Sequence, residues 1–468
     1  MFNKTKKSAI FIVTAVLMIV TVMLTACNAN AFQPVEPPAA GKLPQGNGGN
    51  AVVYDKWLYY VNGYQSSASA ENTYTNVKAR VGAIARIELD VLESLFGVME
   101  DKDNYSTSAA RTNKIAELVA EKAEIVVPKF YYSGNTTSTQ INGIYIYEER
   151  LYILTPNDEL TAGGNSQTSQ SVLTSFKLDG SDEQRHYTFS SNSAQILLCE
   201  GEHKLLALYI SGSDVGCVDA SNGQELVKVE QTSGATIDVA DQSVFYIDSE
   251  TNAICKLHAG DAQSKVVVDN NKDSNITYSI SNVNGGYVYY TKSYSINSGI
   301  NTLQVYYAVE GQTEKDTVAL KTSAPSSNWY GYKNGIVKEF SYDADENVTL
   351  YGINILDADS KVIKTVVEPI NNDKSVTFNR IEGDKLYYTC DNVAYVVDLS
   401  GDNGPQAIGR SLASASGWSV PDIVYTDNGY NYVITLSSGA VGAIKFNVEA
   451  KTNSDSVTIT IVEPTEEE

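Results

Sequence analysis

A short strand preceded by a turn recurs along the chain, and this repeat constrains the fold more than any other feature. Six of the turns can be marked at Lys204, Ser243, Gly286, Gly335, Lys385 and Gly429, with steps of 39, 43, 49, 50 and 44 residues between them. The residues after each turn are mainly apolar, as in Lys385-Leu386-Tyr387-Tyr388. A period of roughly 40–50 residues made of short strands is typical of β-propeller blades, which have four strands each.

A second class of turn lies between these markers. It is rich in Asp, Asn, Ser and Gly, which accept turn geometry and cap turns with their own side chains, and it includes Leu178–Gly180, Val218–Gly223, Ile355–Asp359 and Val397–Asp402. Two turns per period predict an antiparallel meander of four strands. We therefore expect an all-β chain, a single β-propeller of seven or eight four-stranded blades over residues 51–462.

The ends of this domain also suggest how the ring closes. The segment Ser456–Val462 alternates as a strand does, and we expect it to pair with the first strand near Ala51–Tyr60, because pairing would remove a free edge. Such pairing merges the two ends into one blade and leaves seven. Two separate β-domains are the alternative, but no Pro/Gly linker interrupts residues 51–450.

Tyrosine is unusually frequent, with 31 residues, and it occurs in adjacent pairs. The pairs are Tyr59-Tyr60, Tyr131-Tyr132, Tyr289-Tyr290, Tyr306-Tyr307 and Tyr387-Tyr388. Neighbours in a strand point to opposite faces, and an interior blade is covered on both. We expect both rings of a pair to be buried, with each hydroxyl reaching a polar edge. A sugar-binding aromatic stripe is the less favoured interpretation.

One interval breaks the repeat, from Lys56 to Arg150. Inside it, Leu92, Leu95, Phe96 and Met99 follow helical spacing, and Ile115, Leu118 and Val119 form a second stripe. This predicts a pair of helices inserted near residues 90–125. The pair either caps a blade or the channel mouth, or docks a partner, and the sequence leaves both open.

The first residues read as an export signal. Lys4, Lys6 and Lys7 precede an apolar run that ends at Leu24-Thr25-Ala26-Cys27. This tetrapeptide resembles the lipobox of bacterial lipoproteins, which implies a signal peptide over residues 1–26, diacylglycerol on the thiol of Cys27 and cleavage before it. An uncleaved transmembrane anchor is the alternative, and both place the remainder outside the cytoplasm.

The segment after Cys27 is a tether. Residues 27–50 contain four prolines and four glycines and show no apolar periodicity, so we expect a flexible linker.

The chain has 34 basic and 56 acidic residues, a net charge of −22, and residues 463–468 form an acidic tail. This balance excludes nucleic acid as a partner that binds through a basic face. We expect lipid-anchored localisation at the extracytoplasmic side of the cell membrane, through Cys27.

Taken together, the lipobox, the proline-rich tether and the Leu/Val-Tyr-Tyr hairpins resemble bacterial extracytoplasmic β-propeller lipoproteins of unknown function, with a domain described as low-density-lipoprotein-receptor-like propeller. The resemblance covers most of residues 51–450. It implies a fold and a location and supplies no catalytic residues.

No reaction centre is recognisable, and we predict no catalytic, cofactor-binding or metal-binding residue and no cofactor. His186, His203 and His258 lack metal-ligand spacing, and Val218–Gln224 is similar to a quinoprotein blade turn but lacks the following tryptophan. The run Asp343–Asn347 departs from a calcium loop at its sixth and twelfth positions, so we interpret it as a hairpin turn.

Four cysteines remain beyond Cys27: Cys199, Cys217, Cys255 and Cys390. Export permits disulfides, and Cys199 and Cys217 are close enough in sequence for neighbouring strands, but we favour four small buried thiols.

Three functions stay open from the sequence. The leading hypothesis is a non-enzymatic scaffold that binds a protein or glycan through the loops of the propeller, helped by the helical insertion. A hydrolase or lyase acting on cell-surface polysaccharide is the first alternative, and an assembly or folding factor for exported proteins is the second. Enzymatic activity is therefore undecided, and the fold alone cannot choose.

Overall fold

The strands follow from the repeat. The computed structural model describes residues 51–61, 84–127, 144–157, 159, 164, 169–202, 204–269, 275–296, 299–311, 318–320, 329–345, 348–370, 376–390, 393–410, 422–425, 431–436, 444–448 and 457–459. The signal peptide 1–26, Cys27, the linker 27–50 and the acidic tail 463–468 lie outside these residues and remain predictions.

The described strands form eight four-stranded sheets, each built from four consecutive strands. The first four sheets are β1 (Ala51–Tyr54), β2 (Trp57–Val61), β3 (Ile84–Glu88) and β4 (Glu124–Val127); β5 (Tyr145–Tyr147), β6 (Arg150–Pro156), β7 (Ser171–Lys177) and β8 (Gln184–Phe189); β9 (Gln195–Gly201), β10 (Lys204–Ser211), β11 (Asp214–Asp219) and β12 (Glu225–Val229); and β13 (Thr232–Asp238), β14 (Ser243–Asp248), β15 (Ile254–His258) and β16 (Lys265–Val268).

The other four sheets continue the pattern. They are β17 (Ile276–Asn284), β18 (Tyr287–Ile296), β19 (Gly299–Val309) and β20 (Val318–Leu320); β21 (Trp329–Tyr332), β22 (Gly335–Asp345), β23 (Val348–Asp357) and β24 (Val362–Ile370); β25 (Val376–Glu382), β26 (Lys385–Cys390), β27 (Val393–Asp398) and β28 (Gln406–Arg410); and β29 (Asp422–Tyr425), β30 (Asn431–Leu436), β31 (Ile444–Val448) and β32 (Val457–Ile459).

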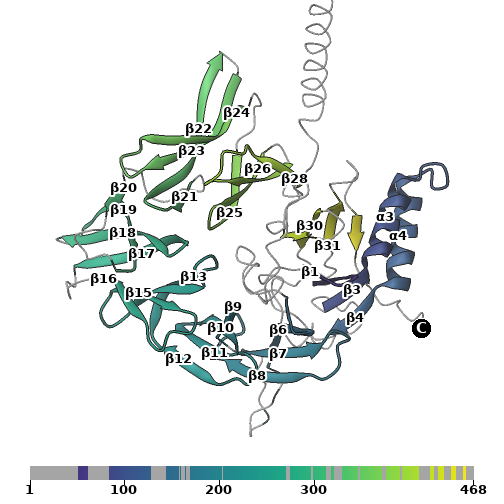
Figure 1. The fold of residues 1–468 in the computed structure, drawn as a ribbon, viewed down its shortest axis with the longest axis horizontal. Coiled ribbons are helices and arrows are strands. Elements are labelled where there is room, and N and C mark those ends of the chain that lie inside the picture. Colours follow the sequence, from purple (N-terminus) through teal and green to yellow (C-terminus); the bar gives the residue numbers. More distant parts are fainter. Residues whose placement is uncertain are drawn as a thin grey trace, which may run out of the picture.

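The sheets stand around a common centre, as Figure 1 shows, so the fold is a β-propeller. Adjacent sheets contact one another, in several cases through their first strands, as β13 does with β17 and β17 with β21, and the contact of β1 with β29 completes the ring. The predicted all-β class and single propeller are confirmed, with eight sheets.

The predicted closure is wrong. Among the described residues, β1 pairs with β2, whereas the last strand, β32, pairs with β31 in the register Ile444↔Ile459. The physical reason is that β29 to β32 supply all four strands of the eighth sheet, so this sheet needs no strand from the N-terminal segment. The first and last sheets therefore meet face to face without a shared strand.

Three of the four described tyrosine pairs have both rings buried, as expected. Both rings are buried in Tyr59-Tyr60, Tyr289-Tyr290 and Tyr387-Tyr388, while Tyr306 is only partly buried and Tyr131-Tyr132 lies outside the described residues. The hydroxyl of Tyr289 donates to the Lys333 carbonyl at 2.7 Å. The expectation fails at Tyr60 and Tyr388, whose buried hydroxyls have no hydrogen-bond partner among the described residues.

The helical insertion lies within the first sheet, between β3 and β4. It consists of α3 (Leu89–Glu100) and α4 (Ser108–Lys122), and the side chain of Thr107 caps α4 by accepting a hydrogen bond from the Ala110 amide at 3.1 Å. The apolar faces of the two helices enter the core of the first sheet. No helix in the described part of the chain is both long and apolar enough to cross a membrane.

The four cysteines Cys199, Cys217, Cys255 and Cys390 are buried, and none of them forms a disulfide bond. Cys199 pairs in register with Leu206, and Cys217 with Leu208, so the two cysteines flank β10 on opposite sides. They do not lie on neighbouring strands, and the interpretation as buried thiols is confirmed.

Candidate functional site

The topology gives the ring two unlike faces. In an antiparallel meander the first and third connections of a sheet emerge at one end and the second connection at the other, together with the link to the next sheet. We call the first end the turn face and the second the loop face. Long stretches of sequence separate some strands that end and begin at the loop face, as between β4 and β5 and between β28 and β29, while the α3–α4 insertion between β3 and β4 belongs to the turn face.

Hairpin turns on the turn face satisfy their own polar groups. Asp179, Asp219 and Asp398 each accept a hydrogen bond from the amide two residues ahead, at 2.9, 3.0 and 2.9 Å. The hydroxyls of Ser181 and Ser400 also donate to Asp179 and Asp398, and these bonds hold the pKa of both carboxyls below the usual value. Carboxylates occupied in this way cap turns, as the sequence predicted.

Two glycines in these turns press against the neighbouring sheet. Gly180 has φ +84° and Gly223 has φ +76°, a region that favours glycine. A Cβ atom would lie 1.9 Å from the Val126 carbonyl oxygen at Gly180 and 1.8 Å from the His186 carbonyl oxygen at Gly223. Each of these two turns therefore packs closely against the backbone of the outer strand of the preceding sheet.

The turns between the first and second strands form hydrogen bonds from one sheet to another. The buried carboxylate of Asp238 accepts hydrogen bonds from the amides of Gly285 and Gly286 in the next sheet, at 3.2 and 2.8 Å, and burial raises its pKa. Asn284 reaches past the sixth sheet to the seventh, where it accepts from the Gly383 amide at 2.8 Å and donates to the Gly383 carbonyl at 3.0 Å. The turn face is thus cross-linked by polar contacts near the centre of the ring.

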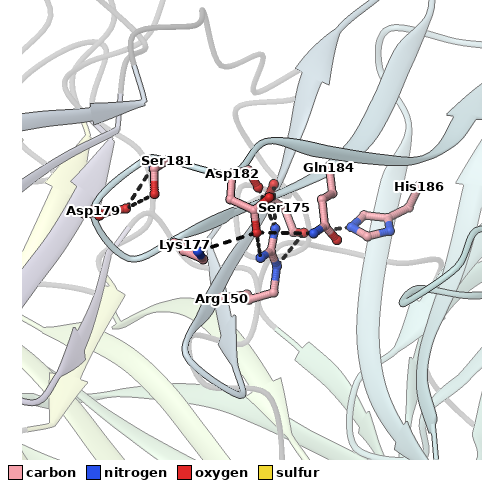
Figure 2. A network of polar contacts seen from close by, with 8 residues as sticks. All are labelled: Arg150, Ser175, Lys177, Asp179, Ser181, Asp182, Gln184 and His186. Carbon is pink, nitrogen blue, oxygen red and sulfur yellow. Dashed lines mark hydrogen bonds and ion pairs between the residues drawn. The ribbon is translucent and has the colours of Figure 1, made fainter.

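A further polar network joins three strands of the second sheet (Figure 2). Arg150 begins β6, and it donates through Nη1 to Asp182 at 2.8 Å and through Nε to Ser175 Oγ at 3.0 Å. Ser175 Oγ lies 2.7 Å from His186 Nε2. Burial lowers the pKa of His186, and its ring stacks on Tyr152 with centroids 5.7 Å apart.

Because Arg150 Nε can only donate, the Ser175 oxygen accepts from it, whereas the donor in the bond between Ser175 Oγ and His186 Nε2 depends on the tautomer of the imidazole. This Ser–His pairing matches the contact that activates a serine nucleophile. However, the Ser175 side chain is fully buried, and its oxygen already accepts a hydrogen bond from the guanidinium of Arg150. The network is therefore a structural link between β6, β7 and β8.

Sequence reasoning missed this network and the contacts across the ring. Arg150, Ser175 and His186 lie on three different strands, and no local motif connects them. His258, also singled out from the sequence, has its Nδ1 atom 2.9 Å from the Ala259 carbonyl, and His203 lies outside the described residues.

The metal and calcium questions can be addressed only for the described residues. There, no group of three or more His, Cys, Asp or Glu side chains is placed to hold a metal ion. Asp343 and Asp345 belong to β22, where Asp345 pairs with Val348 at the start of β23. The interpretation of Asp343–Asn347 as the end of a hairpin therefore agrees with the strand register.

Two hairpins on the loop face are longer than the others. β18 and β19 form one in the fifth sheet, and β22 and β23 form the other in the adjacent sixth sheet. In Figure 1 the sixth sheet reaches farther from the centre of the ring than its neighbours do. These two hairpins extend the loop face, whereas the α3–α4 insertion, which is the third connection of the first sheet, belongs to the turn face.

Comparisons with known proteins give no family. No family model matches the chain, and no curated protein matches it. Among solved structures, the chain is similar to oligopeptidase B from Leishmania major, with 9% identity and a TM-score of 0.37 over 92% of this chain and 61% of that one. It is also similar to the β-propeller domain of the trilobed protease from Pyrococcus furiosus, with 6% identity and a TM-score of 0.33 over 69% of this chain and 95% of that one.

The chain spans about half the length of several of the peptidases it matches. It covers 46% of a puromycin-hydrolyzing peptidase from Mycobacterium tuberculosis, with 12% identity and a TM-score of 0.29 over 66% of this chain. Scores at this level do not carry the fold assignment, which rests on the eight sheets of the chain itself.

Proposed function

We propose that this chain is a lipid-anchored extracytoplasmic β-propeller that binds a protein or a glycan on its loop face, in the manner implied by its resemblance to bacterial propeller lipoproteins. The observation that carries the proposal is the contrast between the two faces. Asp179, Asp238 and Asp398 on the turn face are occupied by contacts within the chain, and the α3–α4 insertion there packs into the core of the first sheet, whereas the loop face carries the two long hairpins. Binding residues concentrate on such connections when a rigid scaffold positions them.

The anchor is proposed from Leu24-Thr25-Ala26-Cys27. Replacement Cys27→Ala removes the thiol that would receive the lipid, so the protein should move from the membrane fraction to the soluble one if the signal is still cleaved. Replacement Thr25→Ala keeps a small residue before Ala26 and is the matched control, which should remain membrane-bound. Labelling with a radioactive fatty acid checks the modification directly. Incorporation of label into the Cys27→Ala protein would refute the anchor.

The loop face is tested by shortening one hairpin without disturbing its base. Tyr342 pairs with Leu350, so residues 343–349 can be replaced by Asn-Gly, which favours a tight two-residue turn. The variant should lose binding to a glycan array or to detergent-solubilised envelope proteins, whichever the full chain binds.

The matched control removes three carboxylates from the turn face, with Glu202→Gln, Asp359→Asn and Asp402→Asn in one chain. This variant should bind as the full chain does. Equal loss in both variants would point to charge alone, and loss only in the control would place the site on the turn face. Turnover of a bound polysaccharide would replace the scaffold with the hydrolase or lyase.

A further inference from the structure

The junction between the first and last sheets differs from a closure by strand exchange. β1 to β4 and β29 to β32 are each complete within themselves, and β1 meets β29 without sharing a sheet. Backbone pairing therefore does not hold this junction together among the described residues. The other junctions between sheets also lack a shared strand, so an element that contacts both sheets here would add to the packing that keeps the ring closed.

The helical hairpin occupies this place. Both α3 and α4 contact β32, the last strand of the eighth sheet, and Figure 1 shows the two helices beside the meeting point of the first and last sheets. The same helices contact β3 in the first sheet. The hairpin thus touches both sides of the junction, although it is inserted in only one of the two sheets.

The insertion is firmly seated in the first sheet. Leu92 and Leu95 are fully buried, and Ile115 and Val119 are 4% and 1% exposed, all within one apolar cluster with residues of the first and second sheets. The Leu89 amide donates to the Lys56 carbonyl at 2.9 Å. In the fourth and seventh sheets, the backbone amides of Ala259 and Leu399 donate to a carbonyl in the first turn of the same sheet, as Leu89 does in the first sheet. The helix α3 therefore begins at the position where those sheets have a short turn between their third and fourth strands.

We propose that the α3–α4 hairpin is a clasp that closes the propeller by holding the eighth sheet against the first. This inference does not depend on the proposed binding function. It follows from a helical hairpin whose apolar residues are anchored in the core of the first sheet and whose two helices both contact the last strand of the eighth sheet. Of the two roles left open by the sequence, the proposal favours the structural one.

The test replaces the clasp with a turn that the chain already uses. Residues 89–123 are exchanged for the sequence Ala-Ser-Asn-Gly-Gln, copied from Ala220–Gln224 between β11 and β12, together with Glu88→Asp. Hydrogen exchange followed by mass spectrometry is then measured on the full chain. Amides of β29–β31 should exchange faster by about tenfold or more, because that sheet opens locally, while β13–β16 should be unchanged.

The eighth sheet is the decisive readout. A helical pair that only covers the first sheet would alter β1–β4 and leave β29–β31 protected, and that result would overturn the proposal. The matched control carries Lys114→Gln and Glu117→Gln, which remove an ion pair of 2.7 Å and leave the apolar faces intact. Its exchange in β29–β31 should equal that of the unaltered protein.

The replacement could fail to fold, and a measurement on the unaltered chain then decides. In native-state hydrogen exchange with rising denaturant, amides of α4 and of β30–β31 should reach one common opening free energy with one denaturant slope, as a single cooperative unit does. Separate opening of α4 and β30–β31, with different slopes, would contradict the clasp.

Discussion

Single atoms decide how closely the sheets approach one another. At Gly223 the missing Cβ allows the turn between β11 and β12 to rest on the His186 carbonyl of the preceding sheet. Gly180 makes the same contact one junction earlier, on the Val126 carbonyl. The Asp and Gly pattern in these turns was readable as hairpin chemistry, but the neighbouring carbonyl was not, because it belongs to a different repeat.

Gly223→Ala should destabilise the protein by about 2–4 kcal/mol, because it adds strain at positive φ and forces two backbones apart. Gly212→Ala is the matched control, since Gly212 also has positive φ, +61°, but a Cβ there meets nothing within 4 Å. The control should lose only about 1 kcal/mol. Urea unfolding measures both, and equal losses would show that the contact with His186 has no energetic weight.

Glu339 is a buried acid in β22. Its Oε1 atom accepts a hydrogen bond from the Val376 amide at 3.2 Å, its Oε2 atom has no partner among the described residues, and burial raises its pKa. Because the folded state holds the proton more tightly than the unfolded state, this group favours folding fully below the unfolded pKa of about 4.3. That contribution is lost as the pH rises through the folded pKa.

Glu339→Gln should therefore flatten the fall in stability between acid and neutral pH and raise stability at neutral pH. Urea unfolding at a series of pH values compares it with Glu117→Gln, whose carboxylate is 63% exposed. If both variants follow the pH profile of the unaltered protein, Glu339 ionises freely in the folded state.

At the scale of elements, the strands and helices were the most predictable part. Turn residues followed by Val, Leu and Tyr marked the hairpins, and the spacing of Leu92, Leu95, Ile115 and Val119 marked α3 and α4. The pairing of β32 with β31 could not be predicted. Alternation of apolar and polar residues indicates a strand, but it is compatible with pairing to β1 or to β31.

The contribution of the second sheet to stability should fall in acid. His186 shares a hydrogen bond with Ser175, and burial lowers its pKa, so the unfolded state takes up a proton that the folded state resists. Stability from this group is present above the unfolded pKa of about 6.5 and is lost as the pH falls toward the folded value.

His186→Gln should remove this acid sensitivity, and His258→Gln, at the end of β15, is the matched control that should keep it. Thermal unfolding between pH 7 and pH 5 provides the measurement. A persistent fall in melting temperature in the His186→Gln protein would assign the sensitivity to other groups.

At the scale of the whole molecule, the repeat predicted a ring but not its internal ties. Asn284 and Gly383 are 99 residues apart and two sheets distant, yet they share two hydrogen bonds. Such contacts depend on the radius of the closed ring, which no local pattern encodes.

The central claim is a ring of eight self-contained sheets, and disulfide trapping tests it most directly. Phe446 pairs with Val457, and Lys445 with Thr458, in the register of β31 and β32. Adjacent antiparallel pairs alternate in geometry, so at least one of the double-cysteine variants at these pairs should oxidise readily. Cysteine at position 457 combined with cysteine at 52 or 53 in β1 should stay reduced. Efficient bonding between β32 and β1, with none between β31 and β32, would contradict the eight-sheet ring.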